Sequence, residues 1–169
     1  MAYAAISKPG SFMSPTIWEG TGASLALTGV GFQPDLTWIK DRDDAYNNFL
    51  FNSVRGALQE VRSNTTAAEA TLANSLSTWG ADGFTLGTDA NTNASGDSFV
   101  SWNWKAGTTT GIAGSPSITP TGYSFNATSG FSIIEWTGTE VNATLPHGLG
   151  VAPKMIIAKS TAIGGWYVY

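Results

Sequence analysis

An internal repeat is the feature that most constrains the fold of this chain. The punctuation Gly29-x-Gly31-x-x-Pro34 recurs, 119 residues later, as Gly148-x-Gly150-x-x-Pro153. Three further segments match at the same spacing or one residue less: 18–21 with 136–139, 38–40 with 157–159, and 49–51 with 167–169. Gly and Pro recur where the backbone rather than the side chain sets the requirement. The repeat therefore predicts two copies of one structural unit.

The second copy contains only the start of the unit. It ends at Tyr169, in an apolar run, and has no counterpart of residues 52–105. We expect the sequence to be the N-terminal part of a longer chain. The alternative is a complete protein whose last strand pairs within a sheet.

The local pattern is that of strands. Short apolar or alternating runs are bounded by Gly and Pro, as at residues 36–40, 49–51, 83–87 and 98–105. In the last run Val100, Trp102 and Trp104 share one face, which we expect to pack on a core. Residues 64–76 are the only helix candidate, rich in Ala but without regular apolar spacing. The sequence predicts an all-β sandwich with a partial second repeat.

Composition excludes several classes of protein. Only 12% of the residues are charged and the net charge is -4, so there is no basic excess to bind nucleic acid. The chain has no cysteine for disulfides or thiolate metal sites. No apolar run approaches the roughly 20 residues of a membrane span, and the start does not read as a signal peptide. We therefore expect synthesis in a cytoplasm, without membrane insertion.

Several motifs, in order, resemble a known kind of protein. Residues 29–40 and 50–56, the run 77–87 ending in Gly-Phe-Thr-Leu-Gly, the run 100–107 and the segment from 131 to 153 resemble a repeated domain of marine bacteriophage tail-fibre-like proteins. The resemblance implies a lectin-like or jelly-roll β-sandwich in the tail of a virion. It implies no catalytic residue and no cofactor.

The resemblance and the repeat together predict the organisation of the chain. We expect an attachment arm at 1–15, a sandwich unit at 16–105, a linker or loop rich in Gly, Thr, Ser and Pro at 106–121, and the second unit from 122. The arm carries the apolar residues Tyr3, Ile6, Phe12 and Met13, which would be buried on a neighbouring protein or on the arm's own sandwich.

We expect a non-enzymatic tail-fibre or adhesin segment that attaches to the tail and supports host recognition. Its expected partners are two further copies in a homotrimer, other tail proteins and a host surface glycan. The competing functions are a carbohydrate-active enzyme of the virion and a capsid decoration protein.

One loop spaces its oxygen atoms like the start of a calcium site. Asp89, Asn91, Asn93 and Asp97 offer hard ligands of the kind that Ca²⁺ prefers. However, Ala94 stands where such loops carry Gly, and Val100 stands where they carry Glu. A polar hairpin loop is the alternative, and we favour it.

The candidates for catalysis are weak. His147 is the only histidine and lies in a turn-like string, so we expect its ring to bond the turn backbone. A pair of carboxylates across a groove could cleave glycosides. The candidates for such a pair are Asp35, Asp41, Asp43, Asp44, Asp82, Glu135 and Glu140. Most of them flank turns, where Asp commonly accepts hydrogen bonds from the local backbone. Trp rings could also stack on sugars, but we expect most of the seven to lie in the core.

Overall fold

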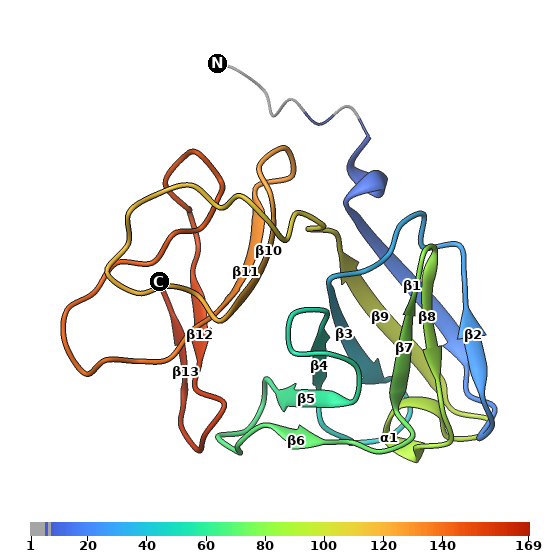
Figure 1. The fold of residues 1–169 in the computed structure, drawn as a ribbon. Coiled ribbons are helices and arrows are strands. Elements are labelled where there is room, and N and C mark those ends of the chain that lie inside the picture. Colours follow the sequence, from blue (N-terminus) through green and yellow to red (C-terminus); the bar gives the residue numbers. More distant parts are fainter. Residues whose placement is uncertain (1–5, 7) are drawn as a thin grey trace.

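The computed structural model describes residue 6 and residues 8–169, and it is almost entirely β-structure. Two lobes lie side by side in Figure 1, one formed by residues up to about 105 and one by the remainder. The expected all-β sandwich is confirmed. Within the described residues, no helix is long and apolar enough to cross a bilayer.

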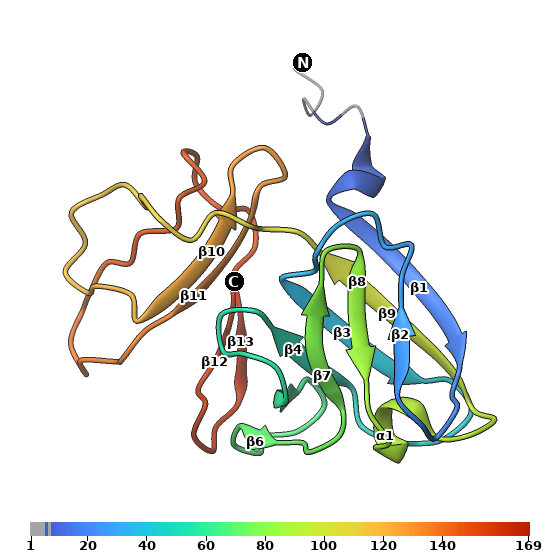
Figure 2. The ribbon, with the colours of Figure 1, turned by 45° about the vertical axis from the view of Figure 1, so that its right-hand side comes forward.

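The first lobe is a sandwich of two antiparallel sheets. The larger sheet has the order β1 (Met13–Glu19), β9 (Ser98–Trp104), β3 (Leu36–Asp41), β4 (Phe49–Asn52), β5 (Gln59–Arg62), β6 (Ala70–Thr71). The smaller sheet has the order β2 (Leu25–Leu27), β8 (Gly83–Leu86), β7 (Leu76–Gly80). Figure 2 shows the smaller sheet in front of β1, β9 and β3.

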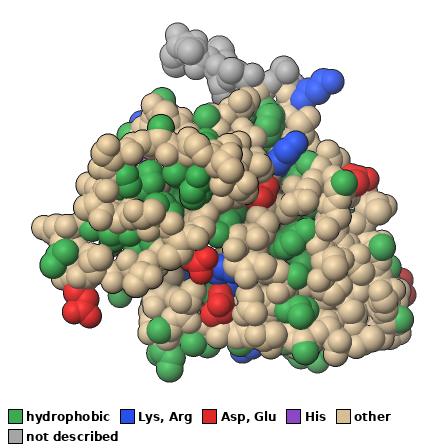
Figure 3. All heavy atoms as spheres, in the orientation of Figure 1, with side chains coloured by type: hydrophobic (Ala, Val, Ile, Leu, Met, Phe, Trp, Pro, Cys, Tyr) green, Lys and Arg blue, Asp and Glu red, His purple; other side chains and the backbone are tan. Residues whose placement is uncertain are grey.

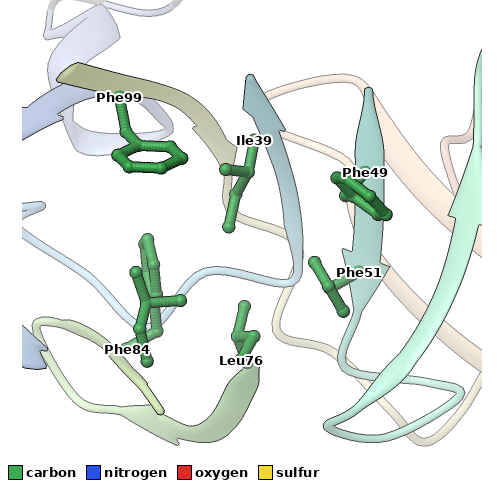
Figure 4. Packing of buried hydrophobic residues seen from close by; sticks show 7 residues of the cluster. Ile39, Phe49, Phe51, Leu76, Phe84 and Phe99 are labelled. Carbon is green, nitrogen blue, oxygen red and sulfur yellow. The ribbon is translucent and has the colours of Figure 1, made fainter. Parts of the chain in front are cut away.

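The core lies between these sheets. Its fully or almost fully buried side chains are Ile39, Phe49, Phe51, Leu76, Phe84, Leu86 and Phe99. Figure 4 shows most of them pointing into the space between the two sheets. Trp18 covers this cluster from β1, stacked on Phe99 with ring centroids 5.5 Å apart.

The second lobe holds two separate hairpins. One pairs β10 (Gly122–Asn126) with β11 (Phe131–Glu135), and the other pairs β12 (Ile157–Lys159) with β13 (Trp166–Val168). The segment between β9 and β10, residues 105–121, contains none of the named strands, although Thr108 forms a bridge to Phe125. The two remaining helical elements are short: the 3-10 turn η1 (Pro9–Ser11) and α1 (Ala90–Asn93).

Two expectations about local structure are wrong. Residues 64–76 form no helix but turns, the short strand β6 and the start of β7. Their irregular apolar spacing gives a helix no apolar face, whereas Leu76 can enter the core as part of a strand.

The aromatic face of β9 is also not the core face. Phe99, Ser101 and Asn103 point inward and are fully buried, whereas Val100, Trp102 and Trp104 are half-buried on the outer face. The polar residues are tolerated inside because Asn103 is hydrogen-bonded to the Thr37 and Ser101 hydroxyls and to the Ser14 carbonyl.

Strand β1 begins at Met13, before residue 16, where we expect the first unit to start. Met13 is already the first residue of β1 and lies opposite Trp104. Pro15 conceals this strand in the sequence, but proline is compatible with an edge strand such as β1. Of the other expected arm residues, Phe12 accepts a hydrogen bond from the Lys105 N–H, Ile6 is half-buried, and Tyr3 lies outside the described residues.

Candidate functional site

The two units meet at a buried polar node centred on Asp35, at the start of β3. This side chain is 3% exposed. Its Oδ1 accepts hydrogen bonds from the hydroxyls of Ser53 (2.6 Å) and Ser124 (2.9 Å), and its Oδ2 accepts one from the Ala106 N–H (2.8 Å). Ser124 belongs to β10, and Ala106 begins the connection to it. Asp35 therefore ties the first sandwich to the second lobe.

Aromatic packing adds to the same junction. Trp104 of β9 stacks on Phe131 of β11 with a centroid separation of 6.3 Å. On the same outer face, Trp38 meets Trp102 edge-on at 5.9 Å. The outer aromatic face of β9 is thus in part an interface between the units.

The β12–β13 hairpin is held on the first unit by the segment that follows β5. The Trp166 indole N–H donates to the carbonyls of Arg62 (2.9 Å) and Thr65 (3.2 Å). Two backbone bonds join the hairpin loop to the same segment, from Glu69 to Thr161 and from Gly164 to Thr66. An ion pair between Arg55 and Glu69 lies beside them. Figure 3 shows acidic and basic side chains together near the middle of the surface.

An open hollow of about 550 Å³ lies at this contact. It is lined by Ser63, Asn64, Thr65, Thr66 and Trp166. Its lining side chains are uncharged hydroxyl and amide groups and one indole ring, whose nitrogen is already hydrogen-bonded. Such a surface can contact a hydroxylated ligand, but it presents no charged group.

The structure disperses the residues of the calcium-loop candidate. Asp89 caps α1, and its Oδ1 accepts from the N–H and side-chain amide of Asn91. Asn93 is fully buried and turns toward β2, where its amide bonds the carbonyls of Ala23 and Gly87. Among the described residues, no three His, Cys, Asp or Glu side chains are grouped so that they could hold a metal ion.

Asp97 belongs to a different group, near the acidic turn after β3. Burial raises the pKa of its carboxyl group, and the charges of Asp41, Asp44 and Asp43 raise this pKa further. Asp41 is fully buried and accepts at Oδ1 from the N–H groups of Asp43 and Asp44. The Ser98 N–H donates to Asp43 and lowers the pKa of that carboxyl group. These carboxylates therefore hold the turn and the start of β9.

The repeated glycine turns differ in their partners. Gly29 and Gly31 donate their N–H groups to the Asp82 carboxylate (2.9 and 2.6 Å), which lowers the pKa of Asp82. Their φ angles of 86° and 89° are in the left-handed region that favours glycine. In the second copy Gly148 and Gly150 have φ of 70° and 73°, but there the Leu149 N–H donates to His147 Nδ1. His147 thus bonds the turn backbone, as expected.

The copies agree most closely in strand register. In β3–β4, Trp38 lies opposite Leu50 and Ile39 opposite Phe49. In β12–β13, the counterparts Ile157 and Ala158 lie opposite Val168 and Tyr167. Both of these pairs of the first hairpin therefore have their repeat-related pairs in the second. Sequence reasoning found this repeat but missed the Asp35 node and the position of Trp166.

These features define an all-β protein of several antiparallel sheets, in which a sandwich is followed by two hairpins and the second of these repeats the β3–β4 pairing. The chain belongs to the family described as "Domain of unknown function (DUF7483)", whose match covers residues 8–169. No curated protein and no solved structure matches the chain. The family description states no function, so the likeness to tail-fibre repeats stays a prediction.

Proposed function

We propose that this protein is a non-enzymatic structural component of a bacteriophage virion, a tail-fibre segment that attaches to the tail and supports host recognition. The observation that carries the proposal is the shared register of the β3–β4 and β12–β13 hairpins. Serial copies of one unit produce an elongated architecture in which each unit contacts its neighbours. The location in the tail of a virion is proposed because the sequence motifs resemble those of tail-fibre-like proteins.

The carboxylates support a structural role over glycoside cleavage. Asp35 and Asp82, which were candidates for catalysis, accept hydrogen bonds from backbone groups or buried hydroxyls. A glycosidase needs two carboxyl groups facing each other across a substrate groove. Here the Asp35 carboxylate stabilises the junction between the units, and the Asp82 carboxylate stabilises the turn at Gly29 and Gly31.

Localisation in intact particles tests the proposal. Gold-labelled antibodies raised against the recombinant chain should mark the tail of the phage that encodes it. Labelling of the capsid shell would favour a decoration protein. Release of reducing sugar from host polysaccharide by the purified chain, lost on substitution of an acidic pair, would favour the enzyme.

A homotrimer is part of the same proposal, because closed symmetry satisfies repeated contacts between fibre units. Sedimentation equilibrium should give three times the chain mass of 17.7 kDa. Deleting residues 1–7 keeps η1 with its Lys8 cap and leaves β1 intact, so this variant tests the arm without opening the sandwich. The variant should fold but fail to join particles. Normal incorporation would contradict attachment by the arm.

Host recognition through a glycan is the last part of the proposal, and the hollow beside Trp166 is its best-suited surface. Hydroxyl and amide side chains surround an aromatic ring there. A glycan array should give hits that Trp166→Ala loses and Trp136→Ala keeps. Trp136 is the matched control because it is 39% exposed and does not line the hollow. Equal hits for both variants would exclude this surface.

A further inference from the structure

The central strand of the first unit has no counterpart among the described strands of the second. β9 lies between β1 and β3 and is hydrogen-bonded to both. The repeat equates β1 with β11 and β3 with β12, and these two strands lie in separate two-stranded sheets. The backbone bonding pattern of each strand identifies which edge of β11 corresponds to the β9-facing edge of β1, and which edge of β12 corresponds to the β9-facing edge of β3.

On β1, the even-numbered residues bond β9. The Lys105 N–H donates to the Phe12 carbonyl, and the Gly20 N–H donates to the Asp97 carbonyl. Because bonding alternates along an antiparallel pair, Ser14 and Thr16 also point their backbone groups at β9. Their counterparts on β11 are Ser132 and Ile134.

On β11, those same positions face the unpaired edge. Phe125 of β10 exchanges both of its backbone hydrogen bonds with Thr108, so its N–H and C=O groups point away from β11. The backbone N–H and C=O groups of its partner Ser132 therefore point away from β10, as do those of Ile134 two residues later. Within the described part of the chain, no strand pairs with that edge.

The same alternation holds for β12. The Arg42 N–H donates to Ser98, so the even-numbered residues of β3, including Trp38 and Lys40, bond β9. Ile156 exchanges both of its backbone hydrogen bonds with Tyr169, so the backbone N–H and C=O groups of its neighbour Ile157 point away from β13. Ile157 is the counterpart of Trp38, and Lys159 is the counterpart of Lys40.

We propose that the unpaired edges of β11 and β12 together accept one antiparallel β-strand with the residue alternation of β9. An added strand satisfies the backbone groups of both edges and joins the two hairpins into one sheet. The inference rests on strand registers and not on the proposed virion function. A second copy cannot supply its own β9 without opening its sandwich, because that strand is central there.

The side chains specify one difference from β9. In the first unit the buried Asn103 bonds the hydroxyls of Thr37 and Thr16. Their counterparts are Ile156 and Ile134, which offer no hydrogen bond. An amide at this position would lose these two of its hydrogen bonds and would lie beside two isoleucine side chains, so the accepted strand carries an apolar residue in place of this asparagine.

Fluorescence anisotropy with labelled peptides tests the proposal on the full 169-residue chain. The probes are the peptide of sequence 97–105 and the same peptide with Asn103→Val. We expect saturable binding at one peptide per chain, with the valine peptide about tenfold tighter. A peptide with Ser101→Pro lacks an N–H that faces the β1 side, and it should not bind.

Protein variants locate the site. Ile134→Pro removes only an N–H of the unpaired edge, so β10–β11 pairing should persist while peptide binding is lost. Ile157→Pro makes the same test on β12. Asn142→Pro, in the irregular segment between the two hairpins, is the matched control and should bind normally. Circular dichroism checks the folding of each variant.

Hydrogen exchange gives the decisive pattern. Bound peptide should slow exchange at the amides of Ser132, Ile134, Ile157 and Lys159. Binding that survives both edge prolines, protection confined to other residues, or no binding of the valine peptide at 100 µM would overturn the proposal. So would a dimer of the free chain that protects these four amides, because a second copy would then be the occupant.

Discussion

The two units share their strand register but not their burial, and the contrast separates two levels of folding. Phe51 of β4 is fully buried, whereas its counterpart Tyr169 is 77% exposed; Phe49 is 1% exposed, whereas Tyr167 is 59% exposed. The register is set within each hairpin by turn and local pairing. Burial needs a second sheet, and the β2-β8-β7 sheet covers only the first unit. Hydrophobic side chains accordingly gather on the surface of the second lobe in Figure 3.

The largest expected effect comes from substituting one repeat-related pair. Phe51→Ala should lower the free energy of unfolding by about 3–5 kcal/mol, because it opens a cavity in the core. Tyr169→Ala should change it by less than about 0.5 kcal/mol, since its ring is mostly exposed. Urea unfolding monitored by tryptophan fluorescence measures both. Equal losses would show that the second unit is buried like the first.

The Asp35 node should give the next largest effect. Asp35→Ala leaves the Ser53 hydroxyl, the buried Ser124 hydroxyl and the Ala106 N–H without their acceptor, and it should cost about 3 kcal/mol. Hydrogen exchange should also accelerate in β10, since Ser124 loses its partner. Lys154→Ala, at the repeat-related exposed position, is the control and should be neutral. A slow-exchanging β10 in the Asp35 variant would show that this node does not join the units.

The two glycine turns should differ in their response to acid. Because the folded state lowers the pKa of Asp82, this group contributes stability above its ordinary pKa of 3.8, and that stability is lost as pH falls through the folded pKa. Asp82→Asn should therefore destabilise the chain at neutral pH, with a difference from wild type that shrinks in acid. His147→Ala, in the second turn, should have a smaller effect at neutral pH. Parallel curves of Tm against pH for wild type and Asp82→Asn would contradict this account.

The smallest effect is a gain in stability. Burial and the neighbouring aspartates raise the pKa of Asp97 in the folded state, so its charge opposes folding above that pKa. Asp97→Asn should raise Tm slightly at neutral pH, and the gain should vanish well below pH 3.8, where the carboxyl group is protonated in both states. Thermal melts at the two pH values measure it. A lower Tm at neutral pH would be the contrary result.

Sequence reasoning identified the repeat because glycine conformation and strand alternation are local properties. It failed at β9, where aromatic residues suggested the inner face. Asn103 lies inside because Thr37 and Ser14, distant in sequence, supply its partners, and the Ser101 hydroxyl accepts a hydrogen bond from the Asn103 amide. The Asp35 node was missed for the same reason, since nothing near Asp35 in the sequence indicates Ser124 or Ala106. Contacts between distant segments have no local pattern from which to predict them.

The central claim, that β12–β13 repeats β3–β4 in register, has a direct test in solution. In an antiparallel pair the Hα atoms of non-hydrogen-bonded partners are close, and Trp38–Leu50 and Ile157–Val168 are such pairs. An NMR spectrum of the isotope-labelled chain should therefore show strong Hα–Hα NOEs for both pairs. An Ile157 NOE to Tyr167 or Tyr169 instead, or none to β13, would contradict the claim.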